Sequence, residues 1–430
     1  MIKKVSKIKA LKGEITIPAD KSISHRAVMF ASIAKGKSII KNFSSGADCW
    51  STLNLFKNLG VEIKELDNKT IEVISNGKFQ APLCPLDVGN SGTTTRLVAG
   101  ILAGQDFDSI LFGDESLSRR PMKRIIEPLT LMGAEIESID GHAPLSIKGR
   151  KLSGIEYVSK LSSAQVKSCV LLAGINKRTE GKTVYTEPVL SRNHTELMLD
   201  YLGANINVQK NSTTVSSSEL VAKDIEVVGD ISSAAFFIVA GLIVEDSDFV
   251  IKNVGINETR AGIIDIAKRM GANLDVFNVR KLAGELVADI RVQYTDSLKS
   301  CVISGQDIPK LIDELPVIAV LASQADGETV IRDAIDLRNK EADRITCLVN
   351  ELKKIGVVIE ELPDGFIVHG RGKSRGKLGG NSVLEVYHDH RLAMSFYIAG
   401  LICEEEIVIK DFEWTNISFP EFEELIEKLQ

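Results

Sequence analysis

A pattern that recurs six times along the 430 residues constrains this chain more than any other feature. In each copy a polar turn of small residues leads into a run that is almost wholly apolar, as in Gly229-Asp-Ile-Ser-Ser-Ala-Ala-Phe-Phe-Ile-Val-Ala-Gly. The copies begin at Asp20, Gly89, Leu161, Gly229, Asp313 and His388. A helix that is apolar on all sides must be surrounded by protein. The pattern therefore predicts six interior helices, at a period too long for the common solenoid repeats.

A second, amphipathic helix is expected after each apolar one. Glycine, the usual residue just past a helix end, stands after five of these second helices, at Gly60, Gly133, Gly203, Gly271 and Gly356. Alternating runs such as Ser109 to Phe112 and Thr183 to Thr186 predict strands between the helices. We therefore expect an α/β (α+β) inside-out fold of six βαβαββ units, with buried helices and outer sheets.

The first helix start, Pro18 to Ala27, has the composition of an anion site. It places Lys21, Ser22 and Arg26 beside the free N–H groups of a helix that Ser22 or Ser24 can cap. A capped core helix with solvated charges would give the same pattern, and this stretch alone does not decide between the two. If the six helices are grouped three and three, their N-terminal ends can face a common place that favours a polyanionic small molecule.

The other helix starts also carry polar side chains, each with a structural alternative. Hydroxyls in the stretches 91–96 and 162–163 can be simple caps, and Asp313 and Glu314 can be explained by the helix dipole alone. Lys340 and Arg344 have the i,i+4 spacing of a surface pair on a helix. Recurrence at corresponding places in the repeat favours a binding role for these residues taken together.

Two further charged segments can be explained without a functional site. The most basic segment, Ser116 to Arg124, is by default a solvated charge run, and Arg192 is either a phosphate clamp or a surface residue. The His388-Asp-His390 pair lacks a further ligand cluster, so no metal is expected.

Composition excludes several classes of protein. The net charge of -6 argues against nucleic-acid or anionic-membrane binding driven by overall charge. The longest apolar run, Ala234 to Val244, is too short to span a bilayer. The six cysteines are scattered without a CxxC pair, which fits a reducing cytoplasm better than a disulfide framework. No GxGxxG fingerprint opens a strand-to-helix turn, so no nucleotide cofactor, and no cofactor of any kind, is expected.

Six motifs in order along the chain resemble the enolpyruvyl transferases, and among them those that act on shikimate 3-phosphate. The motifs are Asp20-Lys-Ser-Ile-Ser-His-Arg26, Gly89-Asn-Ser-Gly-Thr93, Arg120-Pro121, Ser163-Ala-Gln165, Lys340-Glu-Ala-Asp-Arg344 and Asp389-His-Arg391. The resemblance spans essentially the whole chain. It implies transfer of the enolpyruvyl group of phosphoenolpyruvate to the 5-hydroxyl of shikimate 3-phosphate, a step of the shikimate pathway to chorismate and the aromatic amino acids.

The resemblance also implies two similar domains of three repeat units each, which close over substrate in the cleft between them. We expect one domain over residues 1–20 and 230–430 and the other over 21–229, with crossovers near Ala19 to Lys21 and near Val228 to Asp230. A monomer is the expected state.

Site residues follow from the resemblance, motif by motif. Shikimate 3-phosphate is expected at Lys21, Ser22, Arg26, Ser163, Gln165, Arg192, Asp313 and Lys340, with Ser162 as a weaker candidate. Phosphoenolpyruvate is expected at Lys21, Gly92, Arg120, Gln165, Glu341, Arg344 and Arg391. The catalytic candidates are Lys21, Asp313 and Glu341. Asp313 would accept the hydroxyl proton, Glu341 or Lys21 would protonate the methylene carbon, and Lys21 would assist the departing phosphate; His390 would have a supporting role.

The chain departs from the family near its C-terminus. The family often has a cation just ahead of a Phe-Pro pair, whereas Trp414-Thr-Asn-Ile-Ser-Phe-Pro420 has none, although Lys410 is nearby. Gly92 would leave room beside phosphoenolpyruvate where a side chain could exclude glyphosate, so sensitivity to that inhibitor is a hypothesis.

Two rival functions stay open at this point. The sister transferase acting on UDP-N-acetylglucosamine usually has a cysteine before its Arg-Pro pair, and Asp114 to Pro121 contains none. A repeat-built binding scaffold without catalysis would tolerate replacement of Lys21, Asp313 and Glu341.

Overall fold

The computed structural model describes residues 1–372 and 378–430, which form two compact units. The first unit comprises Met1–Pro18, Gly229–Arg280 and Leu286–Gln430, and the second comprises Ala19–Val228 and Lys281–Glu285. The chain thus passes from one unit to the other at Pro18–Ala19 and at Val228–Gly229. Each passage is held inside one unit by a backbone hydrogen bond: the N–H of Asp20 donates to the Val228 carbonyl (2.8 Å), and that of Asp230 donates to the Pro18 carbonyl (2.9 Å).

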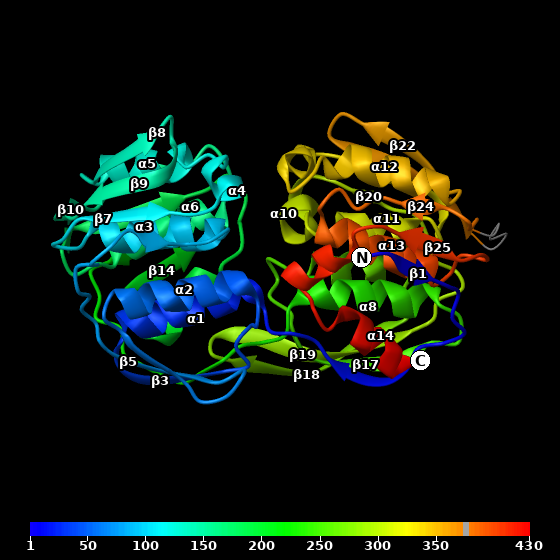
Figure 1. The fold of residues 1–430 in the computed structure, drawn as a ribbon, viewed down its shortest axis with the longest axis horizontal. Coiled ribbons are helices and arrows are strands. Elements are labelled where there is room, and N and C mark those ends of the chain that lie inside the picture. Colours follow the sequence, from blue (N-terminus) through cyan, green and yellow to red (C-terminus); the bar gives the residue numbers. More distant parts are fainter. Residues whose placement is uncertain (373–377) are drawn as a thin grey trace. The chain divides into compact units, whose positions relative to one another are not determined.

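The second unit is built around three helices with almost wholly buried side chains (Figure 1). These are α1 (Lys21–Ile33), α3 (Gly92–Ala103) and α6 (Ala164–Gly174). The other helices of the unit are α2 (Ala47–Asn58), α4 (Glu115–Ser118), α5 (Lys123–Leu131) and α7 (His194–Tyr201). Helices α3 and α6 pack so closely that a Cβ on Gly100 would lie 2.1 Å from the carbonyl oxygen of Cys169. Only glycine fits at that contact.

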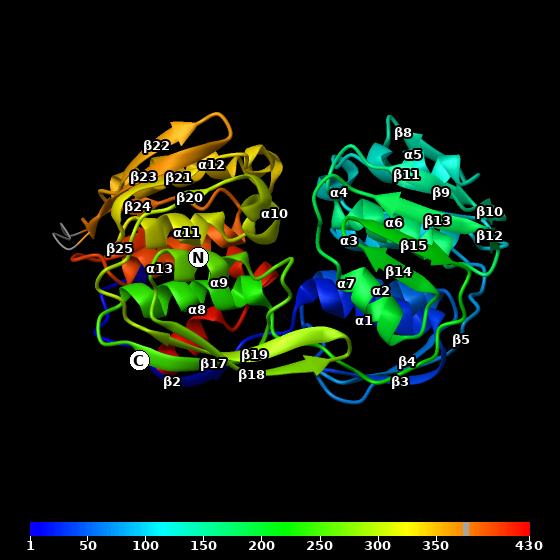
Figure 2. The same ribbon diagram turned by 180° about the vertical axis from the view of Figure 1, so that it is seen from behind.

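Sheets lie outside these helices (Figure 2). The first sheet has the strand order β16 (Ile225–Glu226), β3 (Lys35–Lys41), β5 (Ile71–Asn76), β4 (Glu62–Glu65), and the second has the order β6 (Leu86–Asp87), β7 (Ser109–Phe112), β9 (His142–Lys148), β8 (Glu135–Ile139). The third has the order β11 (Glu156–Val158), β13 (Lys182–Thr186), β15 (Ser212–Ser216), β14 (Ile206–Gln209). A separate two-stranded sheet pairs β10 (Leu152–Ser153) with β12 (Thr179–Glu180). In each four-stranded sheet the first two strands are parallel and the last two form an antiparallel hairpin.

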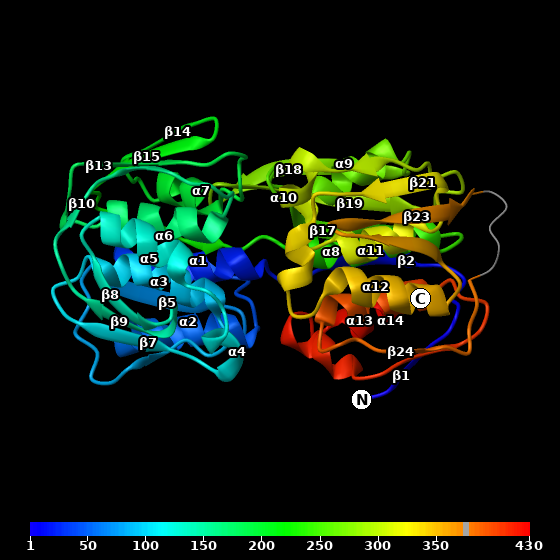
Figure 3. The same ribbon diagram turned by 90° about the horizontal axis from the view of Figure 1, so that it is seen from above.

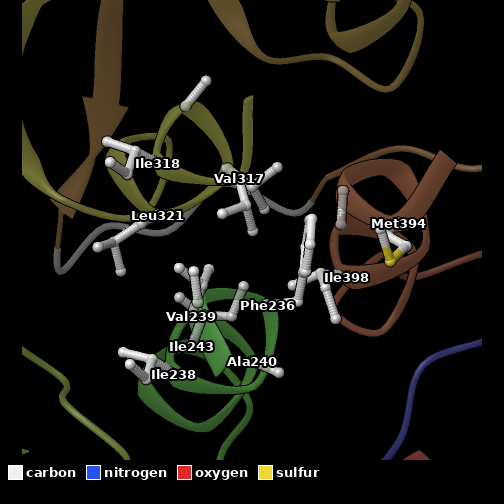
Figure 4. Close-up of a cluster of buried hydrophobic side chains, with 14 of the residues drawn as sticks. Phe236, Ile238, Val239, Ala240, Ile243, Val317, Ile318, Leu321, Met394 and Ile398 are labelled. Carbon is white, nitrogen blue, oxygen red and sulfur yellow. The ribbon is translucent and has the colours of Figure 1, made fainter. Parts of the chain in front are cut away.

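The first unit repeats this plan around α8 (Ile231–Ile243), α11 (Leu315–Ala322) and α13 (His390–Gly400). Phe236, Val239 and Ile243 of α8 point toward Val317 and Leu321 of α11 and toward α13 (Figure 4). The other helices of this unit are α9 (Gly262–Arg269), α10 (Ile308–Leu311), α12 (Arg344–Lys354) and α14 (Phe422–Leu429), with short 3-10 turns η1 (Gly305–Asp307), η2 (Ile335–Asn339) and η4 (Phe412–Ile417).

The sheets of the first unit have the same strand pattern, with one three-stranded exception. Their orders are β18 (Leu274–Leu282), β19 (Glu285–Gln293), β17 (Asp248–Gly255), β2 (Lys12–Thr16); β20 (Val302–Ile303), β21 (Asp326–Ile331), β23 (Gly365–Arg371), β22 (Val358–Leu362); and β1 (Lys3–Val5), β25 (Ile407–Ile409), β24 (Val383–Leu384). Strand β23 lies beside α11 (Figure 3). In the three-stranded sheet, the N-terminal strand β1 pairs with β25 and completes the sixth repeat.

The fold class predicted from the repeat is confirmed. The six expected interior helices are present among the described residues, and the five glycines predicted to end the second helices all have positive φ, between 77° and 94°. Two strand pairings go beyond what the repeat predicts: β2 precedes α1 in the chain but pairs with β17, and β16 precedes α8 but pairs with β3. Each unit therefore completes one of its sheets with the strand that leads out of it.

Candidate active site

The start of α1 confirms the predicted helix but not its predicted cap. Neither Ser22 nor Ser24 is the cap, because the Asp20 carboxylate accepts a hydrogen bond from the Ile23 N–H (2.9 Å). Lys21 is the first helical residue, and its ammonium group pairs with Asp48 at 3.1 Å. Burial disfavours the charged form of Asp48, but Lys21, together with His25 and Arg120, outweighs burial and lowers the pKa of the carboxyl. A carboxylate cap leaves both serine side chains without a capping duty.

At the start of α3, four polar groups gather around Gly92. Ser91 caps the helix by accepting from the Thr94 N–H (3.1 Å), and a Cβ at Gly92 would lie 3.1 Å from a guanidinium nitrogen of Arg96 and 3.4 Å from one of Arg120. Arg96 donates to Gln165 Oε1 (2.5 Å). Burial, with Arg120 and Arg124 as like charges, lowers the pKa of Arg96 to about 10. Clustered arginines of this kind stabilise a bound anion, since the anion relieves their mutual repulsion.

Arg120 belongs to this cluster rather than to a solvated charge run. Its guanidinium donates to Asn90 Oδ1 (2.6 Å) and to Ser116 Oγ (3.3 Å), which fixes the fork beside the start of α3. Its sequence neighbour Arg119 differs, because it is exposed and pairs with Glu115 on the surface. The default interpretation of Ser116–Arg124 is therefore wrong for Arg120 and correct for Arg119.

Arg26 is buried at the meeting of α1, α6 and α7. Its guanidinium donates to Thr195 Oγ1 (2.9 Å), to Ser168 Oγ (3.0 Å) and to the Ser22 carbonyl (2.9 Å). Burial lowers the pKa of Arg26 to about 10, while Glu196 acts in the opposite sense, so the group stays cationic at neutral pH. Arg192 lies near enough to repel it electrostatically.

The serines at the start of α6 have different duties. Ser163 caps α6 by accepting from the Val166 N–H (3.4 Å). Ser162 is hydrogen-bonded in both directions to the Val189 backbone, with its hydroxyl 2.6 Å from the carbonyl oxygen and 3.0 Å from the N–H nitrogen. These two hydrogen bonds tie Ser162 to the loop ahead of α7.

In the first unit, Arg344 is the centre of the candidate residues. Its side chain is 1% exposed, and its nitrogens lie 2.6 Å from Asp389, 2.6 Å from Glu341 and 3.5 Å from Asp313. Lys340 pairs with Asp313 at 3.2 Å. Lys340 and Arg344 do not share a helix as their spacing suggested: Lys340 is extended, and α12 begins at Arg344 behind the Asp343 cap.

The start of α13 brings Arg391 to the same cluster. Asp389, which is fully buried, caps the helix by accepting from the N–H groups of Arg391 (2.8 Å) and Leu392 (3.3 Å). The Arg391 guanidinium donates to the Asp313 carbonyl oxygen (3.2 Å) and lies 3.7 Å from Glu314.

Two neighbouring groups in this cluster, Glu341 and His390, have strongly shifted pKa values. Burial alone would raise the pKa of Glu341, but Arg344, His390 and Arg391 lower it to about 2. Burial, together with Arg391, lowers the pKa of His390 to about 3. At neutral pH Glu341 is therefore a carboxylate and His390 is a neutral ring.

Near the C-terminus, where the cation common in the family is missing, the structure shows how Lys410 and Trp414 are placed. Lys410 pairs with Glu385 (2.6 Å) on the surface. Trp414, within η4, stacks against His388 with ring centroids 4.7 Å apart, next to the Asp389 cap. Tyr387 and His388 both have positive φ (53° and 60°), so an aromatic contact supports a turn that few side chains favour.

Several functional groups escaped the sequence analysis. Asp48 carried no local signal, and Asn90 lies in the second motif without having been singled out. Lys167 did carry one, because a lysine inside the apolar run Val166–Leu172 requires a buried partner. Across residues 1–372 and 378–430, no group of three or more His, Cys, Asp or Glu side chains could hold a metal ion, and no helix is long and apolar enough to cross a membrane.

Comparisons with known proteins agree with this geometry. The family model of EPSP synthase (3-phosphoshikimate 1-carboxyvinyltransferase) matches residues 5–426. A 3-phosphoshikimate 1-carboxyvinyltransferase of Thermodesulfovibrio yellowstonii is 51% identical, with 99% of each chain covered, and one of Bacillus cereus is 49% identical, with 97% of each covered.

Solved structures agree as well. An EPSP synthase structure from Acinetobacter baumannii superposes with a TM-score of 0.92 at 42% identity, over 100% of this chain and 98% of that one. The enolpyruvyl transferase NikO from Streptomyces tendae, at 18% identity and a TM-score of 0.81, shares the fold. The chain therefore belongs to the EPSP synthase (3-phosphoshikimate 1-carboxyvinyltransferase) family.

Proposed function

We propose that this chain transfers the enolpyruvyl group of phosphoenolpyruvate to the 5-hydroxyl of shikimate 3-phosphate and releases inorganic phosphate. The observation that carries the proposal is the cluster around Arg344, where two carboxylates, Asp313 and Glu341, and three cations stand within reach of one another. Anion binding and proton transfer, the two requirements of the reaction, are thus met by neighbouring side chains.

The cations at the helix starts would bind the two anionic substrates. For shikimate 3-phosphate we propose Lys21, Ser22, Arg26, Ser163, Gln165, Arg192, Asp313 and Lys340. For phosphoenolpyruvate we propose Lys21, Gly92, Arg120, Gln165, Glu341, Arg344 and Arg391. Arginine suits the phosphoenolpyruvate carboxylate and phosphate because its planar fork donates two aligned hydrogen bonds to each.

The reaction has an addition and an elimination. In the addition, Asp313 takes the 5-hydroxyl proton, the hydroxyl oxygen bonds to C2 of phosphoenolpyruvate, and C3 gains a proton to give a tetrahedral adduct. In the elimination, C3 loses a proton, the C2–O bond to phosphate breaks, and Lys21 assists the departing phosphate.

The low pKa of Glu341 supports a role for this residue in the elimination. As a carboxylate it is suited to remove the C3 proton in the elimination, whereas Lys21 enters as an ammonium group suited to supply that proton in the addition. Bound phosphoenolpyruvate would offset the charges of Arg344 and Arg391 and so raise the pKa of Glu341, which would let it donate as well.

Further parts of the proposal concern the whole protein. Because residues proposed for each substrate occur in both units, we propose that the units close together on the substrates and that Lys21, at the first passage between them, serves both substrates. We further propose that the protein acts as a monomer in the cytoplasm.

A phosphate-release assay with phosphoenolpyruvate and alternative acceptors tests the proposal. Release is expected with shikimate 3-phosphate and not with UDP-N-acetylglucosamine. Lys21→Met should keep the fold, seen by circular dichroism, and lose turnover. Release with UDP-N-acetylglucosamine alone would favour the sister transferase, release with neither acceptor would favour a binding scaffold, and near-normal turnover in the Lys21 variant would exclude its proposed role.

A further inference from the structure

Lys167, Glu187 and Glu196 form a buried, ion-paired network in the second unit. Lys167, on α6, has a side chain that is 1% exposed, and its ammonium nitrogen lies 2.7 Å from Glu187 and 2.7 Å from Glu196. The two glutamates are equally buried, at 1% and 2%. Three charges held out of water cost stability unless they are paired with good geometry. Their presence inside an otherwise apolar helix therefore calls for an explanation.

The network is hydrogen-bonded to the loop between β13 and α7. Glu187 Oε1 accepts a hydrogen bond from the Ser191 N–H (2.9 Å), and Lys167 donates to the Ser191 carbonyl oxygen (3.3 Å). Both backbone groups of Ser191 are thereby fixed, immediately before Arg192. The same loop is held two residues earlier by Ser162, through both backbone groups of Val189.

The network also sets the charge beside Arg26. Glu196 is the strongest charged neighbour that favours the cationic form of Arg26. Arg26, Lys167, Glu187 and Glu196 together carry two positive and two negative charges. If Lys167 were lost, two buried carboxylates would face a single guanidinium, and their surplus negative charge would oppose a bound phosphate.

Helix α6 connects these contacts to the proposed substrate residues. Its first turn carries Ser163 and Gln165, its next turn carries Lys167, and Ser168 accepts from Arg26 and shares a 2.6 Å hydrogen bond with Thr195 of α7. One helix thus fixes the place of Arg26, through Ser168, and the place of the Arg192 loop, through Lys167.

We propose that Lys167, with Glu187 and Glu196, is a positioning residue for phosphate recognition: it presents Arg192 and offsets the negative charges of the two glutamates near Arg26 without touching the substrate. The inference rests on the proposed function, since it assigns Arg26 and Arg192 to shikimate 3-phosphate. It predicts that loss of Lys167 weakens binding of shikimate 3-phosphate far more than it slows the chemical step.

The test compares variants by calorimetric titration with shikimate 3-phosphate and by steady-state kinetics. Lys167→Met is expected to raise the Kd and the KM for shikimate 3-phosphate at least tenfold, with kcat at saturation within about threefold of the unaltered protein. Adding Glu196→Gln removes the surplus negative charge and should recover part of the lost affinity. Leu145→Ala, a fully buried position on β9, serves as the control for lost stability and should leave the Kd unchanged.

Each outcome decides the inference. A folded Lys167→Met protein with unchanged Kd, or an equal loss of affinity in Leu145→Ala, would overturn it. If Lys167→Met does not fold, the double variant Lys167→Met/Glu196→Gln takes its place, because it leaves no surplus negative charge; it should still raise the Kd through loss of the contact with the Ser191 carbonyl, and an unchanged Kd would overturn the inference. Absence of turnover in the unaltered protein would instead refute the proposed function.

Discussion

Replacement of Arg344 by methionine is expected to destabilise the first unit strongly. The side chain is 1% exposed, and its partner Asp389 is 0% exposed at 2.6 Å. Removal of one member of a buried ion pair typically costs about 3 to 5 kcal/mol, because the other charge is left unpaired. Asp389 keeps two backbone N–H donors, from Arg391 and Leu392, so we place the loss at the lower end, about 3 kcal/mol.

Denaturant unfolding followed by tryptophan fluorescence measures this loss. The chain has 2 tryptophans, Trp50 in the second unit and Trp414 in the first, so a Trp50→Phe background makes the signal specific for the first unit. Arg291→Met is the matched control, because Arg291 also pairs with an aspartate, Asp248 at 2.7 Å, but is 46% exposed, so that its replacement should destabilise the protein far less than that of Arg344.

The double variant Arg344→Met/Asp389→Asn separates the pair from its surroundings. It should be less destabilised than the sum of its two single variants, since the second change removes the charge that the first leaves unpaired. Equal losses for Arg344→Met and Arg291→Met, or strict additivity in the double variant, would refute the assignment of Arg344 as the centre of a buried charge cluster.

Three further predictions follow from other contacts. Gly92→Ala places a methyl group 3.1 Å from the Arg96 guanidinium and should raise the KM for phosphoenolpyruvate while leaving the Kd for shikimate 3-phosphate nearly unchanged, as kinetics and titration would show. The pKa of Glu341 is lower in the folded state (about 2) than the ordinary 4.5, so its stabilisation is complete above pH 4.5 and lost as the pH falls toward 2. Because that side chain is 42% exposed, we expect about 1 kcal/mol, which Glu341→Gln should remove from an acid unfolding curve. Gly100→Ala forces a Cβ to 2.1 Å from the Cys169 carbonyl and should lower the thermal midpoint by several degrees, a loss of about 1 to 3 kcal/mol.

The repeat could be recognised in the sequence because its signal is local. An apolar run such as Ile231–Ile243 has to be interior, and a glycine such as Gly60 marks a helix end by its left-handed backbone. The pairing of β2 with β17 and of β16 with β3 could not be predicted in this way. Their pairing depends on contacts between segments more than 180 residues apart, for which strand pattern carries no information.

The candidate site was predicted unevenly for the same reason. The motifs contain Lys21, Arg120 and Arg344. The i,i+4 spacing of Lys340 and Arg344 wrongly suggested that Lys340 lies on a helix. The two serines of the first motif were predicted as helix caps, whereas Asp20 is the cap. Partners such as Asp48 lie on a different helix, so their pairing can be recognised only in the packed structure. The motifs thus identify many of the candidate side chains, and the tertiary contacts determine the charge states of these side chains.

Transfer of a labelled enolpyruvyl group tests the central claim most directly. The protein is incubated with phosphoenolpyruvate carrying carbon-13 at C3 and with shikimate 3-phosphate, and the products are followed by carbon and phosphorus NMR. The account predicts that the labelled methylene carbon appears in an enol ether on the 5-oxygen of shikimate 3-phosphate, with one inorganic phosphate released per transfer. Labelled free pyruvate with unmodified shikimate 3-phosphate would show hydrolysis without transfer and would contradict it.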